Sequence, residues 1–271
     1  MESQGGQSDM LKKPVRILLL LANFALGIVP SLLFFVWIER NMTLPIIPLS
    51  FGWPWVDLTE VAIGWQLGWN LGLVLVFGVI HSFLAQEKTQ RKLETVLPPQ
   101  ALRTFFMIVT GVSVLILMGC WQSTGRILWA LPFPVRVNYA ISILLFWGIF
   151  SSVLLVMKQH DSLEFLGFRQ IYEPKTAFEK KTYLSGIAKL SKTGFYAFVR
   201  HPIYFLTGLA VFITPVMSLD RLFFLFANGL YLIAALPWEE KKLIALFGSE
   251  YEAYRKEVPA LIPFTKFRAR L

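Results

Sequence analysis

Residues 222–238 read LFFLFANGLYLIAALPW, an uncharged and largely apolar run that is followed directly by Glu239 and Glu240. A run of about 20 such residues is long enough to cross the hydrocarbon core of a bilayer as a helix. Carboxylates are costly inside lipid, so this pair belongs at the membrane surface. The stretch therefore predicts a membrane-spanning helix whose end presents two negative charges.

The composition of the whole chain is also that of a membrane protein. It is 55% hydrophobic and 16% charged, with a mean hydropathy of +0.57, whereas a soluble domain carries about 25% charged residues. We predict an all-α, polytopic membrane bundle of about six transmembrane helices, with an amphipathic helix at the cytoplasmic C-terminal end. The predicted spans are Ile17–Ile38, Val61–Ile80, Thr104–Trp121, Tyr139–Met157, Pro202–Ser218 and Leu222–Trp238.

The positions of Lys and Arg predict the orientation in the membrane. Of the 26 such residues, four (Arg40, Arg126, Arg136 and Arg221) fall on one side of the predicted spans and the other 22 on the opposite side. Because cytoplasmic loops carry the excess of positive charge, both termini are expected to be cytoplasmic. Topology and attraction to anionic lipid head groups explain the net charge of +9, so no nucleic-acid partner is expected.

We expect one membrane domain with two functional parts. Residues 1–157 form a four-helix transmembrane scaffold, and residues 158–271 hold a polar loop, a helical hairpin and the tail helix. The single cysteine, Cys120, lies inside the third predicted span. It allows neither an intrachain disulfide nor a cysteine metal cluster, and we expect no metal site.

The segment Arg200–Tyr204 reads RHPIY and opens the fifth predicted span. Proline is favoured in the first turn of a helix, which places Arg200 and His201 at a helix N-terminus. Unpaired backbone N–H groups and the helix dipole attract anions there, and the arginine adds a full positive charge. The alternative is an arginine whose side chain only reaches the lipid head groups.

The glutamate pair supplies the opposite charge, although it could merely cap the tail helix. Leu243, Phe247, Tyr251 and Tyr254 recur at helical spacing and predict one apolar, aromatic face. A ligand with a carboxylate at one end and ammonium or hydroxyl groups elsewhere would use both charges. S-adenosylmethionine has this layout, and its sulfonium suits an aromatic lining, for which Tyr196, Tyr204, Tyr251 and Tyr254 are available.

The ordered pattern of this region resembles the membrane methyltransferase superfamily that includes isoprenylcysteine carboxyl, phospholipid N- and methanethiol S-methyltransferases. The matching residues are Gly194, Tyr196, Arg200, His201, Pro202, Tyr204, Glu239, Glu240, Leu243, Phe247, Gly248, Tyr251, Tyr254, Val258 and Pro259. The resemblance implies that Tyr196, His201, Pro202, Tyr204 and Glu239 bind S-adenosylmethionine. With the charge argument added, the predicted cofactor-binding residues are Tyr196, Arg200, His201, Pro202, Tyr204, Glu239, Glu240, Tyr251 and Tyr254.

Two further features favour a thiol as the methyl acceptor. The isoprenylcysteine enzymes carry an arginine four residues before the first glutamate, where this chain has Ala235, so a carboxylate acceptor fits less well. Residues 77–85 and 161–170 resemble the corresponding segments of NnrU-type and methanethiol S-methyltransferase proteins. This second resemblance implies a bacterial protein of the inner membrane.

His81, at the cytoplasmic end of the second predicted span, has three interpretations. It can bond a backbone carbonyl or a neighbouring helix, accept a proton from the substrate, or bind haem, as the resemblance to haem-binding relatives of NnrU implies. We predict an S-adenosylmethionine-dependent methyltransferase that acts on a small or lipid-soluble acceptor, a thiol, with His81 as the candidate catalytic residue. The alternatives are a haem-binding, NnrU-like isomerase and an isoprenylcysteine- or phospholipid-type methyltransferase. The expected partners are membrane lipid and the acceptor.

Overall fold

The computed structural model describes residues 11–43, 55–56, 58, 60–159, 162–172 and 190–265. The chain forms two compact units, each assembled from segments that are far apart in the sequence. The first comprises Met1–Phe34, Val79–Ile116 and His160–Ala188, and the second comprises Phe35–Gly78, Leu117–Gln159 and Lys189–Leu271.

Five helices in the described part of the chain are long and apolar enough to cross a membrane. They are Lys13–Glu39, α3 (Ile63–Leu84), α5 (Pro99–Cys120), α6 (Val135–Met157) and α11 (Leu219–Phe247). Large apolar side chains on them are more than half exposed, among them Leu18, Trp65, Leu144 and Phe226, as a surface facing lipid requires. The chain is an integral membrane protein, and the predicted all-α polytopic fold is confirmed.

The first unit is built on close packing between the first long helix and α5. The first helix consists of α1 (Lys13–Ala22), a π-helical segment (Asn23–Ile28) and α2 (Val29–Thr43). A Cβ at Gly111 of α5 would lie 2.0 Å from the carbonyl oxygen of Leu26, so only glycine permits this approach. The short helices α4 (Glu87–Leu93), α7 (Ser162–Phe165) and α8 (Phe168–Tyr172) complete the unit.

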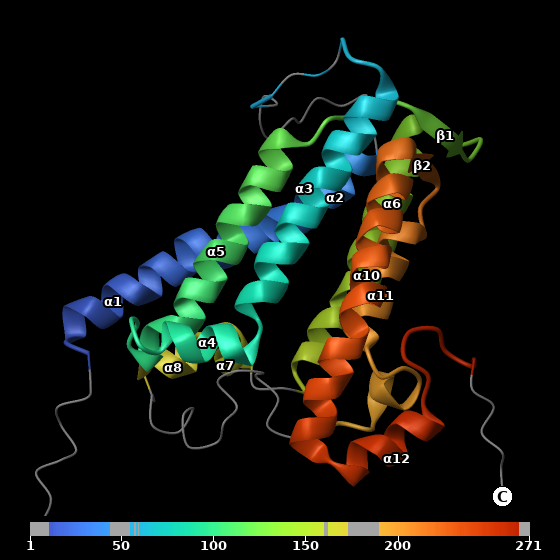
Figure 1. Ribbon diagram of the computed structural model, residues 1–271. Helices are drawn as coiled ribbons and strands as arrows, with labels where there is room; N and C mark the ends of the chain where they lie inside the picture. The colour runs from blue at the N-terminus through green and yellow to red at the C-terminus, as the bar shows by residue number, and fades with distance from the viewer. Residues whose placement is uncertain are drawn as a thin grey trace, which may run out of the picture. The chain divides into compact units, whose positions relative to one another are not determined.

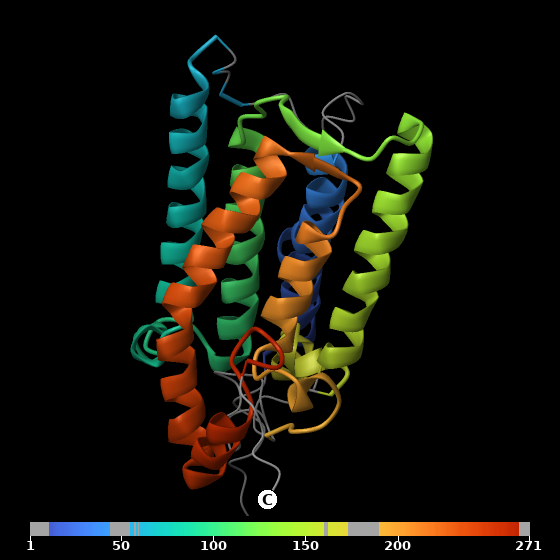
Figure 2. The ribbon, with the colours of Figure 1, turned by 90° about the vertical axis from the view of Figure 1, so that its right-hand side faces the viewer.

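The second unit has its apolar core between α6 and α10 (Pro202–Phe212). Phe150, Val153 and Val156 of α6 pack with Leu206 of α10, and α10 also lies against α11 (Figures 1 and 2). A 3₁₀ turn, η2 (Gly194–Ala197), precedes α10. This packing fixes the N-terminus of α10, which carries the RHPIY segment.

The fifth predicted span, Pro202–Ser218, is helical only up to Phe212, so the helix predicted over its second half is wrong. The helix ends at Phe212, and residues 216–218 form strand β2, which pairs antiparallel with β1 (Ile127–Ala130). Pro215 lacks a backbone N–H and would break a continuing helix. The guanidinium of Arg221 donates to the carbonyl oxygens of Val211 (2.6 Å) and Ala210 (3.0 Å), which the helix leaves unpaired at its end.

The last predicted span, Leu222–Trp238, and the start of the amphipathic helix expected after it form one continuous helix. Helix α11 continues through Pro237 and the glutamate pair to Phe247, because good helix formers follow the pair. Gly248, with a φ of 56°, ends it, and α12 (Ser249–Glu257) follows in a new direction (Figure 1). The residues expected on one amphipathic tail helix are therefore divided, with Leu243 and Phe247 on α11 and Tyr251 and Tyr254 on α12.

Candidate functional site

The RHPIY segment is held against the C-terminal segment of the chain by its backbone. Pro202 occupies the first turn of α10, as predicted, and His201 is the N-cap residue. The N–H groups of Arg200 and His201 donate to the carbonyl oxygens of Pro259 (2.9 Å) and Ala260 (3.1 Å). The segment that follows α12 thus lies alongside the start of α10.

The side chain of Arg200 reinforces this attachment from a buried position. Its Nε donates to Oε1 of Glu240 over 2.8 Å, and its Nη2 bonds the same oxygen. Its Nη1 donates to the carbonyl oxygens of Val258 and Arg255. The arginine therefore joins the start of α10, the end of α11 and the end of α12.

His201 lies between the two glutamates. Its Nδ1 is 3.6 Å from Oε2 of Glu239, and its Nε2 is 3.5 Å from Oε1 of Glu240. Its ring stacks on that of Tyr204, with centroids 5.5 Å apart. Burial lowers the pKa of His201 below its ordinary value of 6.5, and the two carboxylates oppose that shift. The ring is therefore neutral at physiological pH.

Glu239 and the tyrosines form the rest of the cluster. The hydroxyl of Tyr204 donates to Oε2 of Glu239 over 2.7 Å, and that of Tyr254 donates to the carbonyl oxygen of Tyr196 over 2.6 Å. The rings of Tyr251 and Tyr254 meet edge to face at 5.9 Å. Burial, together with the negative charges of the glutamates, raises the pKa of Tyr196 and of Tyr251 to about 12. These tyrosines are therefore neutral donors and ring surfaces rather than bases.

The residues present suit a ligand that carries hydroxyl or ammonium groups. The side chain of Glu239 is 35% exposed, whereas that of Glu240 is 13% exposed and engaged by Arg200. Nε2 of His201 and Oη of Tyr251 are buried atoms that form no geometrically satisfactory hydrogen bond within the described residues. Nε2 nevertheless lies 3.5 Å from Oε1 of Glu240, so the imidazole is held between the two carboxylates. The structure thus brings the nine predicted cofactor-binding residues into one cluster within the second unit.

His81 belongs to the first unit, near the end of α3. Its Nδ1 lies 3.3 Å from Oγ1 of Thr110, and its ring centroid is 5.0 Å from that of Phe106. The guanidinium of Arg103 lies 4.9 Å from the Phe106 ring and donates to the carbonyl oxygen of Phe165. These contacts give the ring a defined orientation, and its catalytic role stays a prediction.

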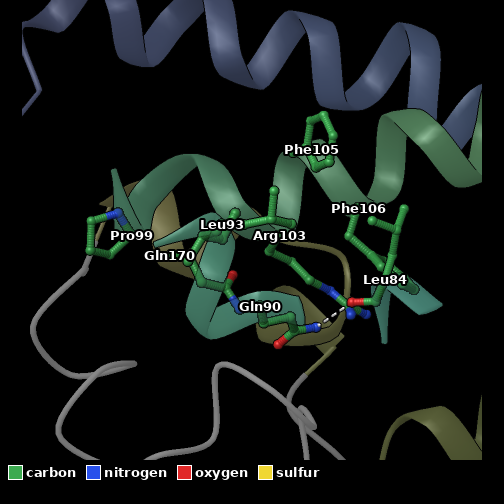
Figure 3. A pocket seen from close by; sticks show the side chains of 9 residues that line it. Leu84, Gln90, Leu93, Pro99, Arg103, Phe105, Phe106 and Gln170 are labelled. Carbon is green, nitrogen blue, oxygen red and sulfur yellow. Dashed lines mark hydrogen bonds between the residues drawn. The ribbon is translucent and has the colours of Figure 1, made fainter. Parts of the chain in front are cut away.

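Arg103 and Phe106 line a pocket of the first unit (Figure 3). Gln90 of α4 closes one side of it by donating to the carbonyl oxygen of Leu84 over 3.1 Å. No group of three or more His, Cys, Asp or Glu residues that could hold a metal ion occurs in the described ranges.

The sequence interpretation did not identify one contributor to the second-unit site. It is the backbone of Pro259 and Ala260, which pairs with the RHPIY segment. Pro259 belongs to the ordered residue pattern of this region, so the sequence does contain a signal for it.

Neither a family model nor a solved structure matches the chain. A methanethiol S-methyltransferase of Mycobacterium tuberculosis is 31% identical over 208 residues, which are 74% of this chain and 80% of the relative. The chain belongs to the methanethiol S-methyltransferase family. A methanethiol S-methyltransferase of Crocosphaera subtropica is 28% identical over 199 residues, 72% of this chain and 74% of the relative.

The chain also resembles the protein nurim of Homo sapiens, with 26% identity over 184 residues, 65% of this chain and 68% of nurim. Membership of the methanethiol S-methyltransferase family makes the chain a methyltransferase, and such an enzyme needs a methyl donor. The resemblance to membrane methyltransferases inferred from the RHPIY segment and the glutamate pair is confirmed.

Proposed function

We propose that the chain transfers a methyl group from S-adenosylmethionine to a small or lipid-soluble thiol. We place it in a bacterial inner membrane, with both termini and the donor site on the cytoplasmic side. The observation that carries the proposal is the cluster in which Glu239, His201 and Tyr204 meet, held by the Arg200–Glu240 pair. Family membership supports the same reaction class.

Each side chain of the cluster has a stated part in holding the donor. Glu239 accepts hydrogen bonds from hydroxyl or ammonium groups, because its carboxylate is the more exposed of the pair. His201 offers Nε2, which lacks a satisfactory hydrogen bond. The partly exposed ring of Tyr196 provides a neutral aromatic surface for a cation, and the buried rings of Tyr251 and Tyr254 keep its surroundings aromatic. Arg200, Glu240 and Pro202 hold the shape of the site, and the charge of Arg200 favours an anionic group nearby.

The chemistry requires positioning more than covalent help. When bound, S-adenosylmethionine supplies a sulfonium methyl group that the acceptor sulfur takes, while the donor leaves as the neutral thioether. Aligning two reactants can lower the barrier by several kcal/mol, up to about 7–11. The acceptor thiol must first lose its proton, because the thiolate is the nucleophile. His81 is the candidate residue that accepts this proton.

A thiol fits the chain better than a carboxylate does. Ala235, one turn before Glu239, offers no charge to a substrate carboxylate. The relatives from Mycobacterium tuberculosis and Crocosphaera subtropica are named for methanethiol as the acceptor. An uncharged thiol can also enter through the lipid-facing side of the bundle without a desolvation cost for charge.

The purified protein, given S-adenosylmethionine and methanethiol, should release dimethyl sulfide, measured by gas chromatography. It should bind S-adenosylhomocysteine in calorimetry and show no Soret absorption band. Methyl-ester formation on a prenylcysteine with no thioether from any thiol would overturn the acceptor. A Soret band without binding of S-adenosylhomocysteine would overturn the reaction class and favour a haem protein.

His81→Ala should lower turnover while leaving the affinity for S-adenosylhomocysteine within about twofold, because proton transfer matters mainly in the transition state. General-base catalysis contributes about 10²–10⁴ in rate, so a loss of at least tenfold is expected. Ser113→Ala in α5, which removes a hydroxyl bonded within its own helix, is the matched control. Unchanged turnover in a folded His81→Ala variant would exclude His81 as the base.

A further inference from the structure

One face of α11 carries Tyr231, Ala235 and Glu239 at four-residue spacing. Residues four apart lie on the same face of a helix, and these three side chains are half-buried. The side chains on the opposite face of α11 are exposed in this stretch. They are Ile233, Ala234, Pro237 and Trp238. The stripe from Tyr231 to Glu239 therefore faces the protein and runs about 12 Å along the helix axis.

The cytoplasmic end of this stripe is the donor site. Glu239 accepts the hydroxyl of Tyr204 over 2.7 Å and lies 3.6 Å from His201.

The ring of Tyr231 lies directly on the backbone of α3. A Cβ placed at Gly78 would be 2.8 Å from both Cδ2 and Cε2 of Tyr231, closer than side-chain atoms can approach. Gly78 is buried, and glycine at a helix contact lets a large ring pack against the opposite backbone. The ring is therefore supported on one side by α3.

Between this supported ring and Glu239, the stripe presents only the methyl group of Ala235. A molecule that approaches the donor site from the membrane meets an aromatic ring, then a methyl group, and no charge. Aromatic rings make favourable contacts with sulfur. The chemistry of the stripe therefore suits a small, uncharged, sulfur-containing acceptor.

We propose that Tyr231, supported by Gly78, forms the wall of the acceptor-binding site and sets the size of thiol that the enzyme accepts. The proposal rests on the proposed function, because it names the acceptor side of the same reaction. Tyr231 is a specificity-determining residue in this view, and its ring, rather than its hydroxyl, does the selecting.

The test measures kcat/KM of the full-length protein for methanethiol and for 1-propanethiol, with the two methyl sulfides quantified by gas chromatography. Removing the ring in Tyr231→Ala should raise the propanethiol-to-methanethiol ratio by about tenfold or more, since each methylene in an apolar pocket changes selectivity by about 10–200-fold. Tyr231→Phe keeps the ring and should leave the ratio within about twofold.

Gly78→Ala tests the support of the ring without touching Tyr231. The added methyl must displace the ring, so the ratio should shift by at least about threefold. Gly72→Ala is the matched control, because it lies in the same helix and a Cβ there meets nothing within 4 Å. Its ratio should equal that of the unmodified protein, and affinity for S-adenosylhomocysteine should be unchanged in all four variants.

The outcomes separate this proposal from the proposed function. A ratio that stays constant in folded Tyr231→Ala and Gly78→Ala variants would overturn the role of Tyr231 while leaving thiol methylation intact. If Tyr231→Phe or Gly72→Ala shifted the propanethiol-to-methanethiol ratio as much as Tyr231→Ala does, the ring of Tyr231 would not be what selects the thiol. An unmodified protein that binds S-adenosylhomocysteine but methylates neither thiol would overturn the acceptor class itself.

Discussion

Glu239 and Glu240 are adjacent in the sequence but have different surroundings. Glu240 is held by the guanidinium of Arg200, and its side chain is 13% exposed. Glu239 receives the hydroxyl of Tyr204, and its side chain is 35% exposed. The second glutamate therefore stabilises the site, and the first is the one positioned to meet a ligand.

Glu239→Gln should weaken binding of S-adenosylhomocysteine, because a charge-assisted hydrogen bond becomes a neutral one. Such bonds contribute about 1.5–3 kcal/mol, equivalent to about tenfold to over a hundredfold in affinity. Glu250→Gln is the control, since Glu250 is 57% exposed in a surface ion pair with Lys192. Calorimetry measures both variants, and unchanged affinity in folded Glu239→Gln would remove Glu239 from the site.

Arg200 and Glu240 should behave as a coupled pair in a double-mutant cycle. Loss of one partner leaves a buried charge, which costs about 3–5 kcal/mol, so Arg200→Gln and Glu240→Gln should each lower Tm clearly. The double variant should lose less than the two single losses together. The exposed pair of Lys192 and Glu250, 2.8 Å apart, should show almost no coupling. If the double variant lost as much Tm as the two single variants together, Arg200 and Glu240 would not be a coupled pair.

At the scale of elements, α10 is too short to cross a membrane as a helix alone. With 11 residues it is about 16 Å long, about half the hydrocarbon thickness. In the segment that follows, strand β2 is fully buried and paired with β1, so its backbone groups are not left open to lipid. Arg221 provides the remaining hydrogen bonds at the helix end.

Arg221→Met should strongly destabilise the protein, because it leaves the carbonyl oxygens of Val211 and Ala210 without these bonds and the nearby charge of Glu39 without its opposite. Each unsatisfied buried group costs about 1–3 kcal/mol. Thermal unfolding in detergent should show a large fall in Tm. Arg126→Met, at an exposed arginine, should leave Tm nearly unchanged. An equally small effect at both positions would show that Arg221 is dispensable.

At the scale of the whole molecule, the number of crossings decides where the termini lie. Five long helices alone would place the two ends on opposite sides of the membrane. We expect a sixth crossing by α10 together with residues 213–218, which would put both ends on the same side, as the Lys and Arg distribution predicts. Fully extended, six residues span at most about 20 Å, so residues 213–218 can supply the missing length even with the bend at Pro215.

Reporter fusions after Lys92, after Lys181 and at the C-terminus should all give a cytoplasmic signal, and one near Trp53 should give an external signal. The expectation follows from six crossings and the excess of positive charge on one side. The fusion after Lys181 and the C-terminal fusion bracket α10 and α11, so opposite signals from these two would show that α10 does not complete a crossing. A cytoplasmic signal near Trp53 would reverse the orientation.

The sequence by itself determined the membrane class, the positions of the long spans and the family. Each span is a local property, because about 20 uncharged residues favour lipid whatever surrounds them. The methyltransferase family could be recognised from the ordered residues between Tyr196 and Pro259. Their types and spacing can be read from the sequence alone, because the pattern does not depend on the fold being known. Pro202 at the first turn of α10 was predictable for the same local reason.

Only the tertiary structure decided which partner each polar group takes. Three features depend on contacts between segments that are distant in the sequence. They are the Arg200–Glu240 pair, the backbone hydrogen bonds to Pro259 and Ala260, and the pairing of strand β2 with β1. The contact of Tyr231 with Gly78 was equally invisible to local patterns. Hydrogen bonds and close packing are set by which surfaces meet, whereas hydropathy only decides which segments enter the membrane.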